Sequence, residues 1–256
     1  MEPLDAQTPM TGLITVDDTD FARLVLRSRL PVAALFGAPD CAASQAMRAG
    51  METLAGRYAG RLTLAALSPE AAPLLAEQCA IPAMPTLAVF RYGEERARAV
   101  GFLPIGLLEL LCQQAADETL PRERLWSPTE AVFEDTVVIP LIRSWGLSYR
   151  RQVHCAPGGR GRPGFVDLLL EEKSGRAISL FENKRLLRTP RDLQPAVNQA
   201  ARYARALELP SFVVADPSAM RVYDWIGPHA RCLAVLSSLD VAQHSQALLH
   251  LLRGLA

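Results

Sequence analysis

Three charged residues in the C-terminal half have the types and spacing of a metal site. Asp167 begins one apolar run, and Glu182 and Lys184 follow the next one. If the two runs are strands of a hairpin, the two carboxylates meet at one end of the sheet. Together with the main-chain carbonyl of Asn183, they supply the oxygen ligands that Mg²⁺ or Mn²⁺ prefers. Glu130, on a preceding helix, would complete or tune the site.

The Glu-x-Lys spacing assigns different tasks to neighbouring residues. Side chains alternate along a strand, so Glu182 and Lys184 share a face and Asn183 points away. A bound metal would lower the pKa of a water molecule, and Lys184 would position or deprotonate that water. The alternative is a surface charge pair, since this spacing often occurs by chance. However, Glu182 directly follows the apolar run 178–181, where a carboxylate without a partner is costly.

The helices and strands predicted around these charged residues are those of a mixed α/β domain. We predict a helix over 129–145 with a kink at Pro140, because proline cannot continue the helical hydrogen bonds. A basic, glycine-rich loop over 155–163 follows an edge strand. The remaining predictions are strands at 147–153, 165–170, 177–184, 211–215, 220–225 and 232–236, and helices at 190–207 and 240–253.

The N-terminal half alternates strands and helices, which is typical of an α/β domain. We predict helices over 20–27, 42–58, 69–79 and 105–116, and strands over 31–36, 62–66, 86–92 and 97–101.

The order of these elements over residues 13–116 resembles thioredoxin. Residues 31–41, PVAALFGAPDC, are similar to the strand that leads into the redox motif of that family. Residues 81–86, IPAMPT, are similar to its cis-proline loop, which implies a cis peptide at Pro85.

The chemistry departs from the family pattern. The second cysteine of the dithiol falls on Ser44, and the usual preceding tryptophan and buried carboxylate fall on Asp40 and Leu35. Without a resolving thiol, ordinary disulfide reduction is not expected. Cys41 is then either a monothiol that forms mixed disulfides or senses oxidation, or part of a degenerate docking or dimerisation module. A helix N-terminus would lower its pKa, and Asp40 would oppose that shift.

The C-terminal segment over residues 127–225 resembles the PD-(D/E)xK nuclease domain of type I restriction enzyme motor subunits. The resemblance assigns Glu130, Asp167, Glu182 and Lys184 to the active site. It also implies a QxxxY motif, matched by Gln199 and Tyr203, that contacts substrate phosphate or the neighbourhood of Lys184 from a helix. The alternative is a tyrosine packed in the core and a glutamine facing solvent. The usual Pro-Asp dipeptide is absent, because Pro163 is followed by Gly164. The implied activity is that of a metal-dependent endodeoxyribonuclease acting in restriction or anti-phage defence.

The charge of the chain sums to zero but is unevenly distributed. Residues 1–119 hold 9 Lys and Arg against 14 Asp and Glu, whereas residues 120–256 hold 18 against 13. A basic half favours a polyanionic partner. The arginines expected to contact phosphates, with little reading of sequence, are Arg150, Arg151, Arg160, Arg162, Arg185, Arg188 and Arg191.

The organisation predicted from the sequence is a thioredoxin-like domain over 1–118, a linker over 119–128 and a nuclease domain over 129–256. The five cysteines are scattered, which argues against a disulfide framework and favours the cytoplasm. No apolar run reaches the length of a membrane span, and no secretory signal is visible. Cutting both DNA strands favours a homodimer, and the first domain could serve dimerisation or partner docking. The alternative is a redox or adaptor protein whose second domain binds nucleic acid without cutting it.

Overall fold

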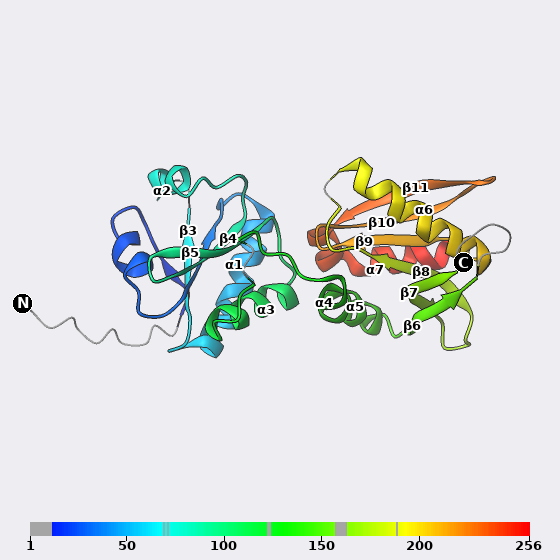
Figure 1. The fold of residues 1–256 in the computed structure, drawn as a ribbon, viewed down its shortest axis with the longest axis horizontal. Coiled ribbons are helices and arrows are strands. Elements are labelled where there is room, and N and C mark those ends of the chain that lie inside the picture. The colour runs from blue at the N-terminus through cyan, green and yellow to red at the C-terminus, as the bar shows by residue number, and fades with distance from the viewer. Residues whose placement is uncertain (1–11, 69, 71, 122–123, 157–162, 188) are drawn as a thin grey trace, which may run out of the picture. The chain divides into compact units, whose positions relative to one another are not determined.

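A computed structural model describes the chain except residues 1–11, 69, 71, 122–123, 157–162 and 188. Its contacts divide the chain into two units, Met1–Trp126 and Ser127–Ala256. Each unit is built around its own mixed β-sheet with helices on both faces (Figure 1). The α/β class predicted for both halves is confirmed.

The first unit has a five-stranded sheet in the order β1-β3-β2-β4-β5. The central strands are continuous apolar runs, as expected for strands covered on both faces. The parallel part joins β1, β2 and β3, and β4 and β5 are antiparallel. The short β1 was not predicted from the sequence. The strands are β1 (Ile14–Thr15), β2 (Val32–Phe36), β3 (Thr63–Leu67), β4 (Thr86–Arg91) and β5 (Glu94–Val100).

Helices cover both faces of this sheet. The contacts of α1 (Ala42–Ala55) and α3 (Ile105–Ala116) are with each other and with strands β3 and β2. The other face packs against the π-helical turn η1 (Ala22–Leu26) and the short α2 (Pro73–Gln78). A short 3-10 turn, η2 (Gly56–Tyr58), ends the helix predicted over 42–58. The predicted helix over 69–79 begins only at Pro73, a residue that favours the first helical turn.

An arm beyond α3 extends the first unit past the boundary predicted at residue 118. Leu125 pairs with Arg98 of β5 in a parallel bridge. The Arg98 N–H donates to the Arg124 carbonyl, and the Trp126 N–H donates to the Arg98 carbonyl, each over 2.7 Å. The Trp126 ring is buried, and its Nε1 donates to Gln114 over 2.8 Å. These bonds attach the end of the predicted linker to the first unit.

The second unit has a six-stranded sheet in the order β11-β10-β9-β8-β7-β6. All neighbours are antiparallel except β8 and β9, which are parallel. Because β8 and β9 are parallel, their C-terminal ends lie at the same edge of the sheet. The strands are β6 (Ser148–Cys155), β7 (Gly164–Glu171), β8 (Ala177–Asn183), β9 (Phe212–Asp216), β10 (Ala219–Ile226) and β11 (His229–Ser237).

The first helix of this unit has three parts. Thr129 caps α4 (Glu130–Phe133), the π-helical segment η3 (Glu134–Val138) follows, and α5 (Ile139–Ser144) has Pro140 in its first turn. Proline removes one main-chain donor. A widened, π-helical segment precedes the proline at which the sequence predicts a kink.

Two longer helices complete the second unit. Figure 1 draws α6 (Pro190–Ala206) on one face of the sheet and α4, α5 and α7 (Ser238–Leu255) on the other. Capping boxes begin both long helices, Thr189 with Asp192 and Ser237 with Asp240. The short last strand predicted at 232–236 is in fact the nine-residue β11, with a bulge against β10. Within the described residues, no helix has the length and apolar character that a bilayer span requires.

Candidate functional site

The structure brings Asp167, Glu182 and Lys184 together at the point where the pairing between β7 and β8 ends. The Lys184 Nζ donates to Glu182 Oε1 over 2.5 Å, so these side chains share a face as the strand period predicts. The main-chain N–H of Asn183 donates to Asp167 Oδ2 over 2.7 Å. Glu182 pairs in register with Val214 of β9, which packs in the core beneath α6. The site therefore lies at the margin of a packed core.

Burial dominates the electrostatics of this group. The Glu182 side chain is only 1% exposed, and burial followed by the nearby Asp167 raises the pKa of Glu182 to about 7. Burial also raises the pKa of Asp167. For Lys184, burial acts against the charged form, but Glu182 outweighs it and the pKa of Lys184 is raised. The group thus holds more negative charge than its single lysine neutralises, a pattern frequent at functional sites.

Two acidic residues of the first helix reach this site. Glu130 Oε1 accepts a hydrogen bond from the Arg185 main-chain N–H over 3.2 Å. Its charge acts on Asp167, Glu182 and Lys184. Glu134 is buried at 5% exposure, and its Oε2 accepts from Asn183 Nδ2 over 2.9 Å.

Glu134 was not predicted from the sequence. The available signal was its position one helical turn after Glu130, next to the apolar residues that face the core.

The donor set fits a hard cation that keeps several of its own water molecules. Among the described residues, no three His, Cys, Asp or Glu side chains gather closely enough to hold a metal by themselves. The metal ligands predicted from the sequence on the two strands include only two such side chains, Asp167 and Glu182, together with the main-chain carbonyl of Asn183. Within the part of the chain described, the buried Glu182 Oε2 has no hydrogen-bond partner. An unsatisfied carboxylate oxygen is costly unless a cation or donor approaches it.

Gln199 and Tyr203 both lie on α6 but in different environments. Gln199 is partly exposed, whereas Tyr203 is 4% exposed and packs in the core with Val166 and Leu180. A Cβ at Gly164 would come within 1.9 Å of the Tyr203 hydroxyl oxygen, so the ring needs a glycine there. Gly164, which breaks the usual dipeptide, therefore makes room for the tyrosine. This position favours a packing role for Tyr203, and substrate contact by either residue stays a prediction.

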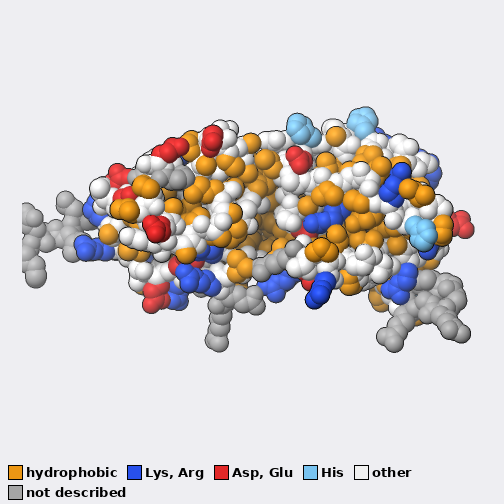
Figure 2. Space-filling view, turned by 90° about the horizontal axis from the view of Figure 1, so that it is seen from above, with side chains coloured by type: hydrophobic (Ala, Val, Ile, Leu, Met, Phe, Trp, Pro, Cys, Tyr) orange, Lys and Arg blue, Asp and Glu red, His pale blue; other side chains and the backbone are white. Residues whose placement is uncertain are grey.

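The predicted phosphate-binding arginines differ in how they are engaged. Arg150 pairs with Glu171 over 2.8 Å. Arg151 pairs with Glu134 over 2.8 Å and with Asp135 over 2.9 Å. The side chain of Arg191 is exposed. The side chain of Arg185 is also exposed, and the other three arginines, Arg160, Arg162 and Arg188, lie outside the described residues. On the face drawn in Figure 2, the Lys and Arg side chains of the described residues are scattered among apolar ones and form no continuous patch.

The first unit presents Cys41 at the start of α1, where it is the N-cap residue and partly exposed. The side-chain hydroxyl and then the main-chain N–H of Ser44 lower the pKa of Cys41, and Asp40 opposes them. Of the two opposing effects expected from the sequence, the lowering of the pKa prevails, and Ser44 contributes most to it. The Met84–Pro85 peptide is cis, as predicted from residues 81–86.

The comparisons with known proteins agree with this geometry. The family model described as Thioredoxin matches residues 12–111. Thioredoxin 1 of Nostoc sp. is 30% identical over 95 residues, which are 37% of this chain and 89% of that protein. Over residues 12–111, the chain belongs to the thioredoxin family. The chloroplastic M-type thioredoxin of Spinacia oleracea is 32% identical over 89 residues, which are 35% of this chain and 49% of that protein. The chain thus spans only about half the length of this curated relative.

The matched residues lie within the first unit, so the function of the second unit is inferred from its own geometry. In the thioredoxin unit, the departures from the family pattern are visible in the structure. Ser44 is buried at 4% exposure where the second cysteine would stand, and Leu35 is buried at 2%. The thioredoxin unit keeps the fold of the family, the cis-proline and, in Cys41, the first cysteine of the redox motif.

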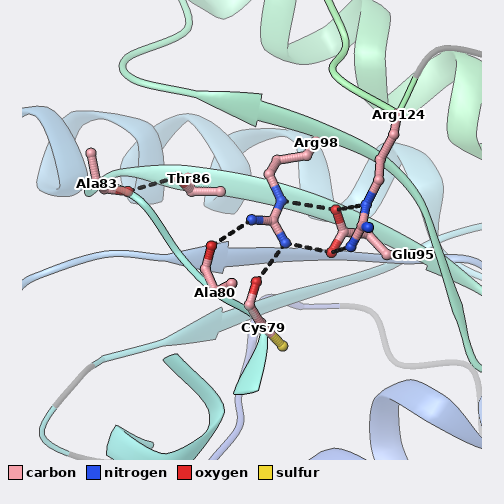
Figure 3. A network of polar contacts seen from close by, with 7 residues as sticks. All are labelled: Cys79, Ala80, Ala83, Thr86, Glu95, Arg98 and Arg124. Atoms are coloured by element: carbon pink, nitrogen blue, oxygen red, sulfur yellow. Dashed lines mark hydrogen bonds and ion pairs between the residues drawn. The ribbon is translucent and has the colours of Figure 1, made fainter. Parts of the chain in front are cut away.

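A buried ion network supports the loop that carries the cis-proline (Figure 3). The Arg98 guanidinium donates to the carbonyls of Cys79 and Ala80 over 2.7 and 2.9 Å. It also donates to both oxygens of Glu95, over 2.8 and 2.6 Å. Arg124 of the arm donates to the same two oxygens over 3.1 Å each. The thioredoxin unit thus uses the arm to complete the network beneath residues 79–85.

Proposed function

We propose that residues 127–256 form a metal-dependent nuclease of the PD-(D/E)xK type, acting on DNA as an endonuclease. The observation that carries the proposal is the convergence of Asp167, Glu182 and Lys184 where the pairing of strands β7 and β8 ends. One buried oxygen of Glu182 has no hydrogen-bond partner there among the described residues. The predicted D…ExK pattern and the mixed sheet with parallel β8 and β9 both support it.

Asp167, Glu182 and the Asn183 carbonyl would hold a Mg²⁺ or Mn²⁺ ion, with Glu130 on the helix nearby. A metal bound there supplies a more acidic water molecule and stabilises charge on the phosphate. The raised pKa of Lys184 keeps its ammonium protonated at neutral pH. Lys184 therefore acts first as a hydrogen-bond donor that orients water and offsets phosphate charge, rather than as a base. The ion pair with Glu182 holds the ammonium in place for this task.

Cleavage of linear and circular DNA by the full chain tests this proposal, with Mg²⁺, Mn²⁺ or EDTA present. The variant Lys184→Ala is expected to lose about 100-fold or more of the activity, the size usual for a group acting at the transition state. Lys173→Ala, in the exposed turn between β7 and β8, is the matched control. The proposal fails if DNA and RNA stay intact with every metal, or if both variants cut equally well.

The partners follow from the same proposal. Arg185 and Arg191 near the end of β8, with the arginines of β6, would contact phosphates. A homodimer would supply two sites for cutting both strands, with the thioredoxin unit as the dimer or docking contact. Restriction or anti-phage defence is the biological setting proposed from the family resemblance.

A second activity concerns the thioredoxin unit, because Cys41 is partly exposed and its pKa is lowered. The Cys41 thiolate attacks a disulfide, forms a mixed disulfide and releases the other sulfur of the client as a thiolate. With serine at position 44, the mixed disulfide persists instead of being resolved. Reaction with an aromatic disulfide reagent should release one fast equivalent of thiolate, and Cys41→Ser should abolish it. An unchanged fast phase in Cys41→Ser would exclude this role.

A further inference from the structure

The middle residue of the Glu-x-Lys segment is held from two sides. The Asn183 side chain points away from Lys184 and donates from Nδ2 to Glu134 Oε2 over 2.9 Å. Its main-chain N–H donates to Asp167 Oδ2 over 2.7 Å. Asn183 is 1% exposed, so water does not replace these bonds readily. Two carboxylates from different elements therefore fix one residue of β8.

Glu134 is itself braced by an arginine from β6. Arg151 Nη2 lies 2.8 Å from Glu134 Oε1, and Arg151 Nη1 lies 2.9 Å from Asp135. The side chain of Glu134 is 6% exposed, whereas that of Asp135 is 55% exposed. The helical neighbours of Glu134, Phe133 and Val138, are fully buried. A carboxylate in such surroundings is costly, and an apolar residue would satisfy packing alone.

We propose that Glu134 is a positioning residue for the metal site, acting through Asn183. By holding the Asn183 side chain on the helix face, Glu134 fixes the peptide units on either side of this residue. The Asn183 carbonyl is then fixed within the plane of the sheet, and the side chains of Glu182 and Lys184 are held on the opposite face. This inference rests on the proposed nuclease function and adds a residue that the sequence analysis did not assign.

Mg²⁺ binding by the full chain, measured by titration calorimetry, tests the role without relying on activity. Partners that orient metal ligands typically change affinity 10- to 100-fold when removed. Glu134→Ala should therefore weaken Mg²⁺ binding at least about tenfold. Glu134→Gln should recover most of the affinity, because its amide oxygen still accepts from Asn183. The matched control is Asp135→Ala, which removes a charge next to the same Arg151 and should leave binding unchanged.

An isosteric exchange keeps the inference testable if Glu134→Ala does not fold. Asn183→Asp places two acceptors opposite each other and should weaken Mg²⁺ binding. The double variant Asn183→Asp with Glu134→Gln restores one donor and one acceptor at unchanged net charge. It should recover the affinity lost in Asn183→Asp. A double variant no better than Asn183→Asp alone would overturn the inference.

Failure of the proposed nuclease function and failure of the Glu134 role would give different results. A wild-type chain that neither binds Mg²⁺ nor cuts nucleic acid would overturn the proposed function and this inference with it. A wild-type chain that does both, while Glu134→Ala binds Mg²⁺ as tightly as Asp135→Ala, would overturn this inference alone.

Discussion

Each unit contains a buried glutamate beside basic residues, but the two are satisfied to different degrees. In the first unit, both oxygens of Glu95 accept from Arg98 and from Arg124. Burial alone would raise the pKa of Glu95, yet these arginines lower it. In the second unit, Glu182 has one lysine and the acidic Asp167 as neighbours, and its pKa rises to about 7. A fully paired charge stabilises the fold, whereas an under-paired one retains the capacity to bind a cation.

Glu95→Gln should have the largest effect on stability. It leaves Arg98, whose side chain is 12% exposed, without a negative partner. Breaking a buried ion pair costs about 3 kcal/mol or more. We expect chemical denaturation of the first unit to show a loss of this size, largest at neutral pH and smaller as Glu95 becomes protonated in acid. Glu94→Gln, at a 73% exposed side chain, is the control and should change little. An equal loss of stability in Glu95→Gln and Glu94→Gln would mean that the ion pairs of Glu95 do not stabilise the first unit, and Glu95 would then not differ from Glu182 in this respect.

Glu182→Gln should act in the opposite direction in metal-free protein. The folded chain holds an extra proton on Glu182 between its ordinary pKa of 4.5 and about 7, so wild-type stability falls as pH rises through this window. At about 1.4 kcal/mol for each pKa unit, this loss is on the order of 3 kcal/mol. In EDTA at pH 8 the variant should therefore be more stable, and near pH 4 the two should be equal. A destabilised variant at pH 8 would mean that Glu182 is paired as well as Glu95.

Arg124→Gln should have the smallest effect. Its side chain is 69% exposed, and exposed ion pairs contribute about 1 kcal/mol or less. Hydrogen exchange is the sharper measurement, because the amides of residues 79–86 lie over the network that Arg124 completes. We expect modestly faster exchange there and no change in β1. Exchange that increases uniformly across the first unit would instead indicate global destabilisation.

Local patterns were sufficient to predict much of the molecule. Apolar runs predicted the central strands, because strands covered on both faces need them. The resemblance of residues 81–86 to the thioredoxin cis-proline loop implied the cis peptide at Pro85, and the Glu182–Lys184 spacing predicted that these two side chains share a face. Each of these depends on neighbours in the sequence.

The features that were missed depend on contacts between distant residues. Glu134 meets Asn183 across 49 positions, and the arm that ends at Trp126 meets β5. The role of Gly164 is visible only once the Tyr203 ring is seen against it. The apolar pattern of 232–236 was too short to predict the whole of β11, because the exposed edge strand has few buried positions.

The arm has an evolutionary consequence. A gene that exchanged its first unit by recombination would need a joint after Trp126, since an earlier joint would remove the indole and Arg124 from the thioredoxin unit. It would also need a joint before Thr129, which caps the helix that carries Glu130. Only Ser127 and Pro128 lie between these limits. A joint that preserves the described contacts of both units is therefore confined to these two residues.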